Sequence, residues 1–170
     1  HTLLARAIGI DAFVYTWNGR ALAQQSALAG EEDVNARTLD ALVDAASAGG
    51  HLKVAIQYEP KVHMLGWVDG QPTFAERKAG IVSDLVWFVL RYDGRRGILQ
   101  KDGRLVVFLF WQNVCMPSGG CLGDDDWADI AQAVRSATGR ELALVATNSP
   151  ASVTTPISGL LRWGLVAPGL

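Results

Sequence analysis

Four short apolar runs recur along the chain, and each of them ends in aromatic and polar residues. They occupy residues 13–18, 54–60, 105–113 and 142–148. The third run opens with six apolar residues, 105–110, without polar alternation. Such a run is typical of a strand covered on both faces, as the strands of parallel sheets are. The chain is therefore expected to build a parallel sheet whose strand ends carry polar and aromatic side chains.

Helical periodicity occupies the intervals between these runs. Apolar residues within 39–46 follow the i, i+3, i+4, i+7 spacing of one helical face. Further helices are expected at about 74–91 and from residue 124 to Gly139, and a fifth strand is expected to begin near Gly159. Regular alternation of strands and helices predicts right-handed crossovers within one α/β sheet.

Two architectures fit this alternation, a doubly wound open sheet and part of a (β/α)₈ barrel. Long loops follow the predicted strand ends, whereas the returns to the opposite edge are short, and barrel enzymes place their chemistry in such loops. A complete barrel takes about 250 residues, but this chain of 170 residues holds four to five units. We therefore expect a partial (β/α)₈ (TIM-type) barrel, a single domain over residues 1–170 that is truncated at both ends.

Charge and hydropathy remove two classes of partner. The formal net charge is -2, and Arg95-Arg96 is the longest basic run, so the electrostatic term that supplies most nucleic-acid affinity is missing. The longest apolar stretches, such as 81–90, fall well short of the roughly 20 residues needed to cross a bilayer. We expect neither a nucleic-acid partner nor a membrane span.

The two cysteines, Cys115 and Cys121, flank a loop rich in turn-forming residues. A disulfide is favoured over two free thiols, and a metal site ranks third because two thiols without a nearby His cannot form a structural zinc site unaided. We expect an extracellular or periplasmic location. Nucleotide-binding glycine motifs and the Gly-x-Ser-x-Gly motif are absent, so we expect no cofactor.

Glu59 is the predicted catalytic residue, since it closes the second strand immediately before Pro60. Side chains alternate along a strand, so Gln57 and Glu59 share one side, which we expect to face the mouth of the barrel, whereas Tyr58 faces the other way. A carboxylate there accepts hydrogen bonds from sugar hydroxyls, or serves as acid or base if burial raises its pKa. The alternative is a structural Glu paired with an Arg or with loop amides.

Flat indole rings at strand ends suggest a carbohydrate ligand. Trp17 and Trp111 each precede an amide side chain, and we expect both to bind substrate rather than to fill the core, the alternative role of a large ring. The predicted substrate-binding set is Trp17, Asn18, Gln57, Tyr58, His63, Trp111, Gln112 and Asn148.

Residues 7–17, 53–60 and 102–108 together resemble the first half of the glycoside hydrolase family 99 and family 71 barrels. The resemblance implies a retaining, endo-acting, cofactor-free (β/α)₈ barrel that acts on α-linked mannose or glucose polymers. It also implies that Glu59, in the Glu-Pro pair, lines the sugar site. The catalytic motif Asn-Glu-Trp-x-Glu of family 99 is absent from this chain, and Lys61 stands where the family has Tyr.

Three functional hypotheses follow. The first is a glycoside hydrolase segment that binds or hydrolyses α-linked glycans together with the missing C-terminal half of the barrel. The second is a non-catalytic carbohydrate-binding half-barrel. The third is an open α/β domain that binds another small molecule at a topological switch point.

Overall fold

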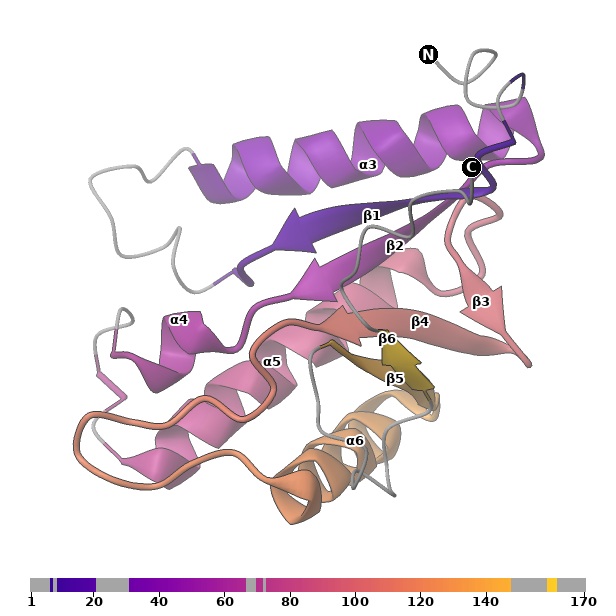
Figure 1. Ribbon diagram of the computed structural model, residues 1–170. Helices are drawn as coiled ribbons and strands as arrows, with labels where there is room; N and C mark the ends of the chain where they lie inside the picture. The colour runs from indigo at the N-terminus through magenta and orange to yellow at the C-terminus, as the bar shows by residue number, and fades with distance from the viewer. Residues whose placement is uncertain are drawn as a thin grey trace, which may run out of the picture.

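The parallel strands of the sheet lie side by side in the order in which they occur along the chain (Figure 1). The computed structural model describes residues 7, 9–20, 31–66, 70–71, 73–147 and 159–161. Within them the parallel strands are β1 (Ala12–Trp17), β2 (Lys53–Tyr58), β4 (Arg104–Leu109), β5 (Leu142–Thr147) and β6 (Gly159–Leu161). A short strand, β3 (Gln100–Lys101), pairs antiparallel with β4.

In the described residues, helices connect the strands from β1 to β5. They are α3 (Glu31–Gly49), α4 (Lys61–Met64), α5 (Phe74–Tyr92) and α6 (Asp124–Thr138). Each crossover moves one place in the same direction along the sheet, from β1 to β2, β4, β5 and β6. Because parallel crossovers are right-handed, helices that follow one direction lie on one face of the sheet.

This order confirms the predicted partial barrel. A doubly wound sheet reverses its strand order at a switch point, and the described strands do not reverse. The open-sheet alternative, and with it the small-molecule site at a switch point, is therefore wrong for this part of the chain.

The sequence located the main elements to within a few residues, with three differences. Helix α3 begins at Glu31, ahead of the periodic stretch. Helix α4 and strand β3 were not predicted, because elements of four and two residues are too short to show a period. Strand β4 ends at Leu109 rather than Phe110, since the backbone turns at Trp111.

The core lies between the sheet and its helices. Val54, Ile56 and Tyr58 of β2 join Leu105, Val107 and Leu109 of β4 in one buried cluster with α3, α5 and α6. The alternate residues form the opposite face, where Thr16, Gln57, Phe108 and Val145 stand in one row across the sheet. This second face corresponds to the inside of a barrel.

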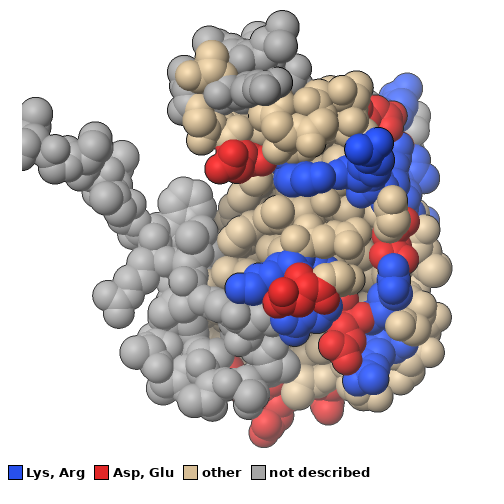
Figure 2. Space-filling view, turned by 90° about the vertical axis from the view of Figure 1, so that its right-hand side faces the viewer, with Lys and Arg blue, Asp and Glu red and all other residues tan. Residues whose placement is uncertain are grey.

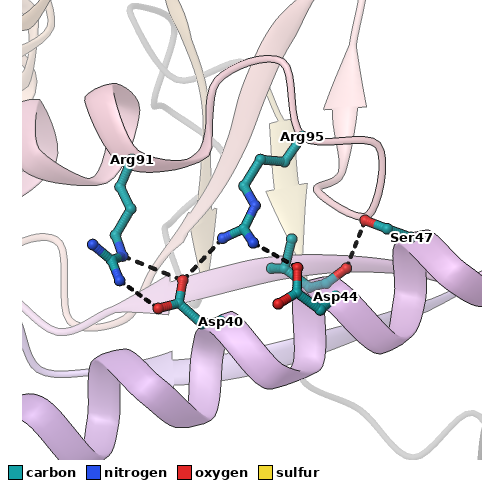
Figure 3. A network of polar contacts seen from close by, with 6 residues as sticks. Asp40, Asp44, Ser47, Arg91 and Arg95 are labelled. Atoms are coloured by element: carbon teal, nitrogen blue, oxygen red, sulfur yellow. Dashed lines mark hydrogen bonds and ion pairs between the residues drawn. The ribbon is translucent and has the colours of Figure 1, made fainter.

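Acidic residues of α3 fasten this helix to the end of α5 and the turn after it (Figure 3). Asp40 accepts hydrogen bonds from Arg91 and Arg95, and Asp44 accepts one from Arg95. The hydrogen bond from Arg91 is the largest cause of a lowered pKa for Asp40. The ionised carboxylate therefore stabilises the contact between the two helices.

Replacing Asp40 by asparagine should give a pH-dependent loss of stability. The folded pKa of Asp40 lies below its unfolded value, so its charge stabilises the fold above the ordinary carboxyl pKa of about 3.9 and ceases to do so as pH falls through the folded pKa. Chemical denaturation of both proteins should show a difference at pH 7 that shrinks below pH 4. A difference that stayed constant down to pH 2 would contradict this assignment.

The amino ends of the strands carry intermixed positive and negative side chains (Figure 2). Arg104 at the start of β4 lies 3.6 Å from Asp102, and Arg135 of α6 lies 2.9 Å from Glu141, just before β5. In barrels this end serves stability, whereas active sites lie at the carboxyl ends. No helix in the described ranges is long and apolar enough to cross a membrane.

Candidate functional site

Glu59 follows β2 directly, and its side chain lies at the carboxyl edge of the sheet. Its backbone N–H donates to the carbonyl of Trp17, which joins the ends of β1 and β2. The residue is only 8% exposed, and Lys61 Nζ lies 2.5 Å from its Oε2. Gln57, two residues earlier, shares the same side of β2 and is also buried. The partner of Glu59 is therefore a lysine from the next turn, not the arginine considered from the sequence.

Lys61 also brings the end of β4 into the site. Its ammonium lies 5.8 Å from the centroid of the Phe110 ring and 5.6 Å from that of Trp111. Both distances fall in the range of cation–π attraction. The Trp111 side chain is half-exposed, at 52%. A carboxylate, an ammonium and an open indole thus converge where β2 and β4 end.

The backbone of Trp111 has φ of 59°, in the left-handed region. A bulky residue seldom adopts this conformation, and such outliers cluster at functional sites. Neighbouring contacts hold it there: Phe110 N–H donates to the Tyr58 carbonyl, and Trp127 Nε1 donates to the Gln112 carbonyl at 2.9 Å. Gln112 itself is buried, so Trp111 alone of this predicted pair presents its side chain to solvent.

The loop that follows is cross-linked. Cys115 and Cys121 form a disulfide, the alternative favoured from the sequence, and Met116 N–H donates to the Gly120 carbonyl inside the closed loop. Val114, Met116 and Leu122 are buried beneath it. The indole at residue 111 therefore stands at the base of a constrained loop.

Trp17 and Tyr58 lie on the other side of the sheet. Trp17 is 2% exposed and stacks on Trp87 of α5, with centroids 5.5 Å apart. Its ring also contacts that of Tyr58, which is fully buried. The structure does not bring either ring beside Glu59, because alternation along β1 and β2 turns both toward the helices. Trp17 therefore lies in the core, which was the alternative to a substrate-binding role.

His63 belongs to a buried polar cluster around Asp84 that the sequence did not reveal. Asp84 Oδ2 accepts hydrogen bonds from Tyr58 Oη at 3.0 Å and from His63 Nε2 at 2.9 Å. Asp84 Oδ1 accepts from the backbone N–H of Arg20 at 2.9 Å. Burial, and then the charge of Asp84, raises the pKa of Tyr58 well above its usual value, so this phenol remains a donor.

This cluster ties the segments after β1 and β2 to α5, and its carboxylate and imidazole are closed to solvent: Asp84 is 2% exposed and His63 0%. His63 Nδ1 lies 2.7 Å from Gln71 Oε1, so both ring nitrogens face oxygen atoms. One signal of Asp84 existed in the sequence, a single acid in the apolar stretch 81–90. His63 is therefore buried beside Asp84 of α5 and does not line the site together with Glu59.

Two predicted residues remain. Asn18 is half-buried just after β1, and Asn148 lies outside the described residues. Among the described residues no three His, Cys, Asp or Glu side chains gather as metal ligands would. The side chains that meet where β2 and β4 end are Glu59, Lys61, Phe110 and Trp111. Gln57 lies two residues before Glu59 on the same side of β2.

Comparison with known proteins adds one finding. No family model and no curated protein matches the chain. A solved structure titled "Glycoside hydrolase-like protein" has the same fold, with a TM-score of 0.62 and 17% sequence identity over 87% of this chain. The chain spans 42% of the length of that protein. At this identity the similarity establishes a glycoside hydrolase-like fold.

Proposed function

We propose that this chain forms the first half of a (β/α)₈ barrel of the glycoside hydrolase 99 and 71 type, and that its carboxyl edge binds an α-linked mannan or glucan. The observation that carries the proposal is the meeting of Glu59, Lys61 and the open indole of Trp111 at the ends of adjacent parallel strands. Barrel enzymes place their sites at this edge.

The chemistry of these side chains suits a sugar. A pyranose has an apolar face of C–H groups and a rim of hydroxyls. An indole in contact with the apolar face leaves the hydroxyls free for polar partners, and few convergent polar groups beside an aromatic surface are typical of small-molecule sites. Glu59 and Gln57 supply such polar groups on the same side of β2.

Hydrolysis needs a second carboxylate, because glycosidases place two acids on either side of the scissile bond. Asp84 does not meet this need, since it is buried among the residues on the helix side. The family 99 motif that holds the catalytic acids belongs to a later strand end, and this chain spans 42% of its structural neighbour. We therefore assign binding to this half and place hydrolysis in the whole barrel.

A non-catalytic carbohydrate-binding half-barrel is the second candidate. The ion pair favours it, because Lys61 Nζ, 2.5 Å from Glu59 Oε2, occupies a carboxylate oxygen that a catalytic acid or nucleophile would turn toward the substrate. Hydrolysis of α-mannan or α-glucan by a full-length parent protein would decide for the enzyme. The Cys115–Cys121 disulfide supports an extracellular or periplasmic location, where such bonds persist.

Trp111→Ala should weaken glycan binding by about tenfold or more, because aromatic side chains that become covered on binding dominate recognition sites. Calorimetric titration of the 170-residue chain with α-mannan and α-glucan oligosaccharides measures this loss. Leu90→Ala is a matched control, since Leu90 is another exposed apolar residue, 70% accessible on α5, and it should leave affinity unchanged. If the wild-type chain binds neither α-mannan nor α-glucan oligosaccharides, the proposal is wrong.

A further inference from the structure

We infer that Lys61 and Glu59 together recognise two adjacent hydroxyls of a neutral sugar, and that their pairing excludes glycans that carry a negative charge on the bound residue. The inference rests on the proposed function and adds to it a specificity-determining residue, Lys61. The resemblance to families 99 and 71 does not supply this residue, because those families have Tyr at the position.

The geometry sets the donor and the acceptor side by side. Lys61 Nζ lies 2.5 Å from Glu59 Oε2, and the two side chains are 23% and 10% exposed. The pair is therefore shielded on most sides but keeps an opening. Both residues come from one turn, where Pro60 caps α4, so the two side chains begin at neighbouring points of the backbone.

Adjacent hydroxyls of a sugar match such a pair. Each hydroxyl both donates and accepts, whereas a carboxylate only accepts and an ammonium only donates. One hydroxyl can therefore donate to Glu59 while its neighbour accepts from Lys61, and hydrogen bonds to charged groups are stronger than those between neutral groups. Trp111, whose ring lies 5.6 Å from the same ammonium, then contacts the C–H face of that sugar residue.

The pair also selects on charge. Its net charge is zero, so it gives no long-range attraction to an anion, and a phosphate or carboxylate that reached Lys61 would also face Glu59. Like charges placed together are an effective means of rejecting a wrong ligand. Neutral sugar residues meet no such repulsion.

Lys61→Met tests the inference, because methionine keeps an unbranched apolar side chain and removes the donor. We expect affinity for methyl α-mannopyranoside or methyl α-glucopyranoside, whichever the wild type binds, to fall about 10- to 100-fold. The thermal midpoint should fall as well, because the variant leaves the Glu59 carboxylate, whose side chain is 10% exposed, without its ammonium. Affinities are therefore compared at a temperature at which both proteins are folded. Lys61→Arg keeps a donor and should retain more affinity than Lys61→Met.

A series of monodeoxy glycosides provides the decisive readout. The wild type should lose affinity at two neighbouring deoxy positions, and Lys61→Met should become insensitive to one of the two, as a double-mutant cycle requires. The 6-phosphorylated glycoside should bind the wild type more weakly than the neutral one.

The two failures can be told apart. If the wild type binds no glycoside, both the proposed function and this inference fall. If the wild type binds and Trp111→Ala loses binding, but Lys61→Met binds as the wild type does or the phosphorylated glycoside binds better, only the inference is overturned.

Discussion

Replacing Asp84 by alanine is expected to lower the free energy of unfolding by about 3–5 kcal/mol. The change leaves Tyr58 Oη, His63 Nε2 and the Arg20 N–H without their common acceptor in the interior. Each unpaired buried group costs about 1–3 kcal/mol. Equilibrium unfolding in urea, followed by tryptophan fluorescence, measures the loss because Trp17 and Trp87 lie in the adjoining core.

Asp44→Ala is the matched control for this prediction. Asp44 also accepts a hydrogen bond from an arginine, Arg95, but its side chain is 67% exposed. Exposed ion pairs are worth about 0–1 kcal/mol, so this variant should remain close to wild type. Equal stability of the Asp84 and Asp44 variants would show that the buried cluster does not hold the strand ends to α5.

Gly97→Ala should destabilise the protein by about 1–3 kcal/mol, because the turn after α5 presses against α3. A Cβ atom at this position would lie 2.1 Å from the carbonyl oxygen of Val43 and 2.9 Å from the backbone nitrogen of Ser47. Backbone atoms cannot rotate aside as a side chain can, so the turn must move away from α3. Thermal unfolding should show a lowered midpoint.

Gly123→Ala provides the comparison. Gly123 also has a negative φ, and a Cβ there would meet only the end of the Asp126 side chain at 3.9 Å. Its effect should stay below that of Gly97→Ala. If the two substitutions had equal effects, the cost would come from the loss of glycine in general and not from the contact with α3.

Much of the fold could be predicted because its signals are local. The unbroken apolar run beginning at Leu105 indicated a strand covered on both faces. Strand β4 forms at these residues and lies inside the sheet, between β2 and β5. Alternation placed Gln57 and Glu59 on the side opposite Tyr58, in agreement with the register between β1 and β2. The Gly at 139 ends α6 with a left-handed φ of 71°, as expected for a helix stop.

The candidate site was harder to predict from the sequence, because it depends on contacts between distant segments. Trp17 was expected beside Glu59 from its place at a strand end, but the face it occupies depends on pairing with β2 and on Trp87 of α5. Lys61 was seen only as a departure from a motif, and its contact with Trp111 requires two strands to be adjacent. Asp84 acquires its partners from segments before and after β2.

The left-handed backbone at Trp111 carries a thermodynamic penalty for any residue with a Cβ atom, about 1–2 kcal/mol. Glycine would remove this penalty but would also remove the indole. Folding alone would favour glycine at this position, whereas the glycan contact that we propose requires the indole, and the chain keeps the indole.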